Sequence, residues 1–236
     1  MNSPHTVKNA RERLIVALDF PDAGQALDCA HTLSEDVSFF KIGLQLHTAA
    51  GPEIVRAIAA TGASVFLDLK LHDIPNTVAK AVEAAGELGV AMLTLHLSGG
   101  RRMIEAAVAA RSPSLLLLGV TVLTSSDAET LRETGIEDSV EEQTLRLAAL
   151  GAAAGIGGLI ASPQEVAVLR GRLGKKTILI TPGVRPAWAA ADDQKRFTTP
   201  REAIANGADY LVIGRPITAH PTPREAVRQI LEELNA

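Results

Sequence analysis

The sequence has only one cysteine, Cys29, among its 236 residues. A single cysteine cannot form an internal disulfide, so a fold that depends on internal disulfides is excluded. Cys29 falls in the apolar pattern of a helical stretch, which indicates a small core residue. A chain of this kind fits the reducing cytoplasm, and we expect it there.

Long hydrophobic runs and an excess of basic charge are missing as well. No run of about 18 apolar residues occurs, and residues 1–10 are polar, without the apolar segment of a secretory signal. The formal net charge is −4, which provides neither a basic surface for nucleic acid nor a polybasic membrane anchor. We therefore expect a soluble protein that binds neither nucleic acid nor membranes.

The spacing that metal sites require is also absent. The six histidines follow no ligand pattern, and no second cysteine accompanies Cys29, so we predict no bound metal. His96 ends an apolar run, and we interpret it as a hydrogen-bonded histidine of the protein interior.

Eight apolar runs, most of them followed by a helical pattern, make up most of the chain, and 47% hydrophobic residues suffice for a large core. The predicted strands cover residues 14–18, 39–44, 65–71, 91–96, 115–123, 158–161, 177–181 and 210–214. The predicted helices cover about 24–35, 52–60, 75–89, 100–110, 127–133, 139–154, 163–170 and 222–235, with Ser162 as the N-cap of the seventh.

This alternation, at a spacing of roughly 20–40 residues and without a linker, predicts a single (β/α)8 TIM barrel. We assign residues 1–236 to one barrel domain, with residues 1–11 as a short polar N-terminal extension. A doubly wound sheet is the alternative. The barrel is favoured because polar residues follow nearly every strand, where the catalytic face of this fold lies. These residues are Asp19, Lys41, Asp68, Lys70, His96, Thr124, Arg185 and Arg215.

Residues 65–78 contain the densest group of charges in an apolar setting. Asp68 and Lys70 are two residues apart and therefore share one face of the strand. Asp73 falls in the loop that follows, because Pro75 suits the first turn of the next helix.

Lys41, inside the strand at 39–44, supplies a second ammonium group next to Asp68, Lys70 and Asp73. Alternating charges keep one another ionised in an apolar site and form a preorganised field. A carboxylate raises the energy of a bound anion, while a neighbouring lysine stabilises a carbanion and supplies a proton. The set therefore favours decarboxylation.

Arg185 follows the seventh strand, and Gly214 with Arg215 follows the eighth. Barrels commonly bind phosphate at this position, so the sequence predicts a phosphate ester as substrate. The loop at 184–197, which contains Gln194, is long enough to act as a lid.

The decapeptide Asp-Leu-Lys-Leu-His-Asp-Ile-Pro-Asn-Thr at 68–77 closely resembles the signature of the orotidine 5′-phosphate decarboxylases, in their bacterial form. The resemblance covers the whole chain in the family's order. It continues through Leu18-Asp19, Lys41-Ile-Gly43, Val120-Thr-Val-Leu-Thr-Ser125, Thr181-Pro-Gly-Val-Arg-Pro186, Asp193-Gln194 and Ile213-Gly-Arg215. The chain departs from the family's pattern at Asp192 and around Trp188, in the predicted lid.

The resemblance implies that orotidine 5′-phosphate is converted to uridine 5′-phosphate and carbon dioxide without a cofactor, the last step in making the pyrimidine nucleotide. Lys70 would protonate C6 of the pyrimidine, and Asp68 would face the departing carboxylate. Lys41 and Asp73 would complete the charge network.

The same resemblance implies how the substrate is held. Asp19 and Lys41 would bind ribose hydroxyl groups, and Thr124 would lie beside the base. The phosphate would be held by Arg185, Gln194, Gly214 and Arg215. Asp73 and Thr77 would reach in from the second subunit of a homodimer.

Two alternatives stay open. A magnesium-dependent sugar-phosphate decarboxylase or aldolase of the same barrel group shares the pattern of Asp68, Lys70 and Asp73, but Lys41 occupies space and charge that a divalent cation would need. A non-catalytic nucleotide-binding protein would keep the phosphate site, but binding alone does not require the four alternating charges.

Overall fold

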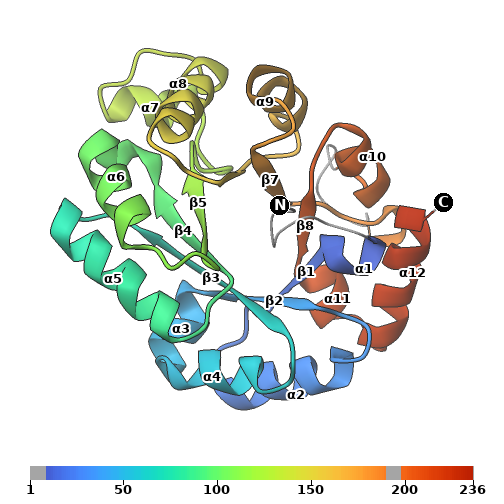
Figure 1. Ribbon diagram of the computed structural model, residues 1–236. Coiled ribbons are helices and arrows are strands. Elements are labelled where there is room, and N and C mark those ends of the chain that lie inside the picture. The colour runs from blue at the N-terminus through green and yellow to red at the C-terminus, as the bar shows by residue number, and fades with distance from the viewer. Residues whose placement is uncertain (1–8, 190–197, 236) are drawn as a thin grey trace.

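The structure, a computed structural model, describes residues 9–189 and 198–235. Its eight strands form one closed parallel barrel in the order of the sequence, and β8 pairs with β1 to close it. The helices lie around the outside of the barrel (Figure 1). The predicted (β/α)8 barrel is therefore confirmed, and the doubly wound alternative is wrong.

The elements are as follows. The strands are β1 (Leu14–Ala17), β2 (Phe39–Gly43), β3 (Ser64–Leu71), β4 (Met92–His96), β5 (Leu116–Val120), β6 (Gly158–Ile160), β7 (Ile178–Pro182) and β8 (Tyr210–Ile213). The helices are α1 (Ala10–Arg13), α2 (Ala23–Leu33), α3 (Leu44–Ala50), α4 (Glu53–Ala59), α5 (Pro75–Glu87), α6 (Gly100–Ala110), α7 (Ala128–Glu133), α8 (Val140–Ala153), α9 (Val166–Leu173), α10 (Pro200–Ala205), α11 (Arg215–Thr218) and α12 (Pro223–Asn235), with short 3-10 helices at Leu97–Gly99 and Ala187–Ala189.

Several element boundaries differ from the prediction. The strand predicted at 115–123 ends at Val120, and the chain then leaves the sheet. Helix α9 begins at Val166, with Glu165 at its N-cap position, so the assignment of Ser162 as N-cap is wrong. The backbone N–H of Ser162 instead donates to the Glu165 carboxylate at 3.0 Å, which closes a turn before the helix. The predicted N-terminal extension contains the start of α1, and residues 1–8 lie outside the described part of the chain.

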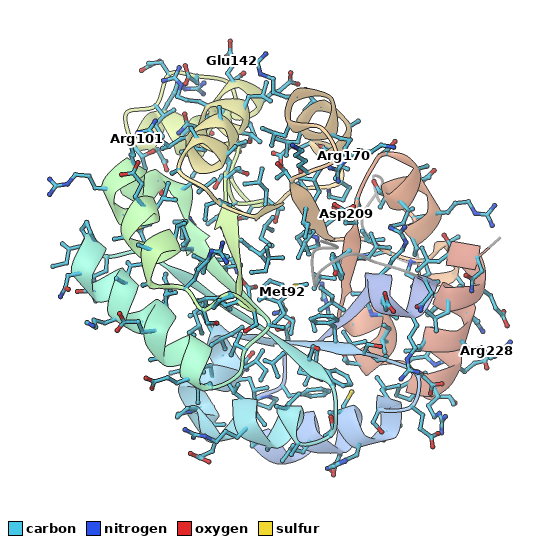
Figure 2. All side chains as sticks on the ribbon, viewed as in Figure 1. Met92, Arg101, Glu142, Arg170, Asp209 and Arg228 are labelled. Atoms are coloured by element: carbon cyan, nitrogen blue, oxygen red, sulfur yellow. The ribbon has the colours of Figure 1, made fainter. Side chains whose placement is uncertain are left out.

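Hydrophobic side chains form two layers, one inside the barrel and one between the barrel and its helices. Phe66 and Met92 pair across β3 and β4 and point into the barrel, where they are fully buried. Met92 lies near the centre in Figure 2. Their neighbours Leu67 and Leu93 point outward into the second layer. Both faces of each strand are thus buried, which is why the strands read as nearly continuous apolar runs.

Cys29 lies on α2 and packs against the outer layer, as expected for a core cysteine, although it is only partly buried. Burial raises the pKa of its thiol to about 11. The thiolate, which is the reactive form, is therefore disfavoured at neutral pH.

The guanidinium group of Arg170 connects α9 to the starts of β7 and β8. Arg170, on α9, donates to the backbone carbonyls of Thr177 at 2.8 Å and of Gly207 at 2.7 and 3.0 Å. It also pairs with the Asp209 carboxylate at 2.6 Å, and the same carboxylate oxygen accepts the backbone N–H of Leu179 at 2.8 Å. Figure 2 labels both charged residues, on the side of the molecule that holds β7 and β8. One side chain thus connects α9 to β7 and β8.

Substitution Arg170→Ala should lower the free energy of unfolding by about 2–4 kcal/mol, because it leaves a partly buried carboxylate and several carbonyls without their donor. Urea denaturation measures this directly. Arg172→Ala, at an exposed position of the same helix, is the control and should change stability by less than about 0.5 kcal/mol. Equal effects of the two substitutions would show that the Arg170 contacts contribute little.

Candidate active site

A cavity of about 560 Å³ opens at the carboxyl ends of the strands. Eight of the predicted site residues line it: Asp19, Lys41, Asp68, Lys70, Thr124, Arg185, Gly214 and Arg215. They come together because the carboxyl ends of parallel strands all meet at one end of a barrel. Asp73 and Thr77 do not line this cavity, and Gln194 lies outside the described residues.

Four of these side chains form a chain of alternating charge. The Lys70 ammonium lies 2.8 Å from both carboxylate oxygens of Asp68. The Lys41 ammonium lies 3.8 Å from Asp68 and 2.9 Å from Asp19. Sequence reasoning placed Asp73 as the second carboxylate of this network, but within one chain that position belongs to Asp19.

Burial makes this pairing necessary. The side chains of Lys41 and Asp68 are 10% and 14% exposed, and that of Lys70 is 30% exposed. Removing such groups from water carries a large free-energy penalty unless opposite charges are close. At an effective dielectric near 20, an ion pair about 4 Å apart gains roughly 4 kcal/mol, which offsets much of that penalty. The close pairing of opposite charges therefore offsets much of the cost of burying Lys41, Asp68 and Lys70.

The backbone of β3 is irregular where it carries these charges. Leu67 pairs with Leu93 and Leu71 with Leu95, so four steps along β3 match only two along β4. Within this bulge Lys70 has φ +50, the only positive φ of a non-glycine residue in the described parts of the chain. Such conformations persist where surrounding contacts enforce them, and they cluster at functional sites.

The contact that spans the bulge comes from Thr94 on β4. Its hydroxyl accepts the backbone N–H of Lys70 at 2.9 Å and donates to the Asp68 carboxylate at 2.9 Å. Sequence reasoning missed Thr94. The only signal was a hydroxyl inside the apolar run 91–96, and its partners depend on the strand register.

Another part of the cavity, after β7 and β8, carries positive charge. Arg185 follows β7 and Arg215 begins α11, directly after β8, and these two strands are neighbours. Neither guanidinium has an ion pair or a hydrogen bond with any residue of the two described ranges. Guanidinium groups exposed to a cavity attract phosphate and carboxylate groups. The arrangement therefore suits an anionic end of a ligand.

The remaining wall is largely apolar. Side chains of Val120, Ile160 and Val212 point into the cavity from β5, β6 and β8. Thr124 and Ser162 add hydroxyl groups at the edge, and Ser162 is a lining residue that the sequence had not indicated. A flat, partly polar ring would find both apolar contact and hydrogen-bonding groups here.

Asp73 and Thr77 follow β3, which carries Asp68 and Lys70, but their side chains do not line the cavity and are exposed on this chain. Asp73 accepts the backbone N–H of Ile74 at 2.6 Å, and no ion pair of Asp73 is found within residues 9–189 and 198–235. The neighbouring Ile74 side chain is itself 66% exposed, which is unusual for isoleucine.

His96 lies at the end of β4, close to the charge network. Its ring centroid is 5.6 Å from that of His72. No hydrogen bond of the His96 ring is found in the described part of the chain, so the predicted hydrogen bond is not supported there. Burial lowers the pKa of His96, and the positive charges of His72 and Lys70 lower it further, while Asp68 acts in the opposite direction.

Part of the predicted lid at 184–197 can be described. Trp188 packs edge-on against His220, with ring centroids 5.4 Å apart. The backbone N–H of Arg185 donates to the carbonyl of Thr198 at 3.1 Å, which brings the two ends of the loop together. Residues 190–197, with Asp192, Asp193 and Gln194, lie outside the described ranges, so the lid stays a prediction.

Two general features of the described residues also bear on function. No group of three or more histidine, cysteine, aspartate or glutamate side chains in these ranges is placed to hold a metal ion. None of the described helices is both long and apolar enough to span a membrane.

Comparison with known proteins gives a consistent result. The family model described as "Orotidine 5'-phosphate decarboxylase / HUMPS family" matches residues 12–230. A relative from Opitutus terrae named orotidine 5'-phosphate decarboxylase is 53% identical over 94% of this chain and 98% of its own length. Another of that name, from Geotalea daltonii, is 49% identical over 98% and 99%.

Solved structures agree in fold. The crystal structure of orotidine 5'-phosphate decarboxylase from Lactobacillus acidophilus superposes with a TM-score of 0.83 at 36% identity, over 94% of this chain and 99% of that one. The protein of the same name from Pyrococcus horikoshii gives 0.78 at 25% identity, with the same coverage.

The His96 environment predicts a pH effect. Because its folded pKa lies below the ordinary value of 6.5, the unfolded chain binds more protons than the folded protein between those two values. Stability contributed by His96 should therefore be complete above pH 6.5 and decrease as the pH falls towards the folded pKa. Titration of the His96 ring by NMR should give a midpoint below 6.5, and His72→Gln should raise that midpoint only partly, since burial is the main cause. A midpoint above 6.5 would contradict the prediction.

Proposed function

The chain belongs to the orotidine 5′-phosphate decarboxylase / HUMPS family, and we propose that it converts orotidine 5′-phosphate to uridine 5′-phosphate and carbon dioxide, the last step in making that nucleotide. The observation that carries the proposal is the chain of alternating charge from Asp19 through Lys41 and Asp68 to Lys70, in one cavity with two guanidinium groups that have no ion pair among the described residues. A substrate with a carboxylate at one end and a phosphate at the other matches both ends of that cavity.

In this proposal the phosphate binds between Arg185 and Arg215, with the backbone of Gly214 beside it and Gln194 closing from the lid. The pyrimidine lies against the apolar wall, next to Thr124. Asp19 suits the ribose hydroxyl groups, because its side chain is 59% exposed and only one of its oxygens pairs with Lys41. A carboxylate oxygen that remains free accepts hydroxyl hydrogen bonds.

The substrate carboxylate then faces Asp68. Repulsion between the two carboxylates raises the energy of the bound substrate, and loss of neutral carbon dioxide relieves it. The C6–carboxyl bond breaks, and its electron pair stays on C6. The Lys70 ammonium, held 2.8 Å from Asp68, stabilises that charge and transfers a proton to C6, after which the lysine amine recovers a proton from solvent. These reaction steps need no cofactor.

Lys41 has a supporting role in the same step. Its ammonium lies between Asp19 and Asp68, so it attracts both carboxylates and holds them in place. Without it, Asp68 would be held by one lysine only, and the repulsion that drives carboxylate loss would weaken. Lys41 also has N–H groups to offer to a ribose hydroxyl.

We also propose that the active enzyme is a homodimer in which Asp73 and Thr77 complete the partner's site. Two observations support this. Neither residue lines the cavity of its own chain, and both are exposed. Ile74, next to Asp73 in the chain, and Leu44, at the start of α3, expose 66% and 54% of their surface, and association could remove such apolar area from water. The partner's Asp73 would then add a second carboxylate near Lys70.

Two other functions are weaker candidates. A magnesium-dependent sugar-phosphate decarboxylase or aldolase would need a cation near Asp68, but the Lys41 ammonium lies in the gap between Asp19 and Asp68. A non-catalytic nucleotide-binding protein would need the phosphate site alone. The buried ion pairs carry a desolvation penalty that binding by itself does not explain.

The purified protein should consume orotidine 5′-phosphate, measured by its loss of absorbance, at the same rate with and without a chelator. Lys70→Ala should lower kcat by on the order of 10²–10⁴-fold, as expected when a general acid is removed. Lys175→Ala, exposed in the loop before β7, is the control and should keep full activity. Activity that disappears with chelator and returns with magnesium would favour the sugar-phosphate alternative.

Mixing two inactive variants tests the shared site. In a heterodimer of Lys70→Ala and Asp73→Ala chains, one site would carry both substitutions and the other neither. After mixing and reassembly, each heterodimer should therefore have up to about half the activity of a wild-type dimer, because one of its two sites is intact. Continued inactivity, with heterodimers shown to form by mass spectrometry, would place Asp73 in the site of its own chain.

A further inference from the structure

We propose that Thr94 is a positioning residue for the reaction, which holds the Lys70 backbone and the Asp68 carboxylate in fixed relation to each other. The inference rests on the proposed function. Thr94 is fully buried on β4 and does not line the cavity, so it acts through its neighbours and does not touch substrate. Its hydroxyl lies 2.9 Å from the Lys70 nitrogen and 2.9 Å from Asp68 Oδ1.

The direction of both hydrogen bonds is determined by the groups involved. A backbone N–H only donates, so the Thr94 oxygen must accept from Lys70. A carboxylate only accepts, so the single hydroxyl proton must point to Asp68. One side chain thus connects the backbone of the proton donor to the carboxylate that its ammonium binds.

The contact lies where β3 needs support. Regular pairing of β3 with β4 is interrupted between Leu67 and Leu71, and Lys70 adopts a positive φ within the interruption. A buried N–H without a partner is strongly disfavoured, and a lysine with positive φ needs surrounding contacts to hold it. The Thr94 hydroxyl satisfies that N–H and so stabilises the conformation that directs the Lys70 ammonium to Asp68.

Threonine suits this task for a second reason. Its branched Cβ restricts the first side-chain torsion, which keeps the hydroxyl in one direction. Leu93 and Leu95 on either side are fully buried, so β4 itself is held firmly in the barrel. Thr94 is therefore a rigid reference point for the two reacting side chains.

The test compares Thr94→Val, which keeps the shape but removes the hydroxyl, with Thr94→Ser, which keeps the hydroxyl. Thr94→Val should lower kcat for orotidine 5′-phosphate by on the order of 10²-fold, the scale of a small misplacement of reacting groups, with KM changed by less than about 3-fold. Thr94→Ser should restore kcat to within about 5-fold of wild type.

Thr181→Val is the matched control. Thr181 is fully buried, and its hydroxyl has no hydrogen-bond partner among the described residues. The same chemical change there should leave kcat and KM unchanged. Amide hydrogen exchange gives a readout apart from activity: the Lys70 N–H should exchange faster in Thr94→Val than in wild type, and remain protected in Thr94→Ser.

The outcomes separate the two proposals. A wild-type protein inactive on orotidine 5′-phosphate overturns the proposed function and this inference with it. An active wild type with normal kcat in Thr94→Val overturns the role of Thr94 alone, as does an equal loss of kcat in Thr94→Val and Thr94→Ser. If Thr94→Val does not fold, Thr94→Cys replaces it, because a thiol is a weak donor and acceptor and should give a kcat between those of wild type and of Lys70→Ala.

Discussion

The site depends on one constraint: burying an ammonium group carries a large free-energy cost unless carboxylates lie beside it. Lys41 meets this constraint with Asp19 on one side and Asp68 on the other. The barrel brings the three together because β1, β2 and β3 are consecutive neighbours whose ends meet at the same edge, with Ala17 beside Lys41 and Gly43 beside Asp68. Gly43 belongs to the same requirement, since a Cβ there would lie 2.9 Å from the Lys41 ammonium.

A second constraint concerns the backbone of β3. β3 carries two consecutive members of the charge network, and it does so with a bulge that leaves Lys70 at positive φ. The rest of the barrel is regular and densely buried, and its two apolar layers hold β4 in place beside the bulge. The irregular backbone at Lys70 is thus supported by the regular strands around it.

The sequence predicted all eight strands, because strands buried on both faces appear as apolar runs. It placed the end of β5 at residue 123 rather than at Val120, since the apolar run continues after the chain leaves the sheet. The short helices α1, α3, α10 and α11 were missed, although α4 and α7, which are equally short, were predicted. Lining residues at strand ends were predictable from topology. The contacts of Asp19 and Thr94 were not, because they depend on register and on the bulge in β3.

The distribution of charge also makes the cavity directional. In the closed barrel β3 lies four strands away from β7, so the Asp68–Lys70 pair faces Arg185, whose guanidinium has no ion pair among the described residues, while Arg215 follows β8, next to β1. A molecule with two anionic groups therefore has one favourable orientation, because its stronger anion is drawn to the arginines, which pair with no carboxylate in the described part of the chain. Such a field orients an approaching anionic ligand by electrostatic steering, before any hydrogen bond forms.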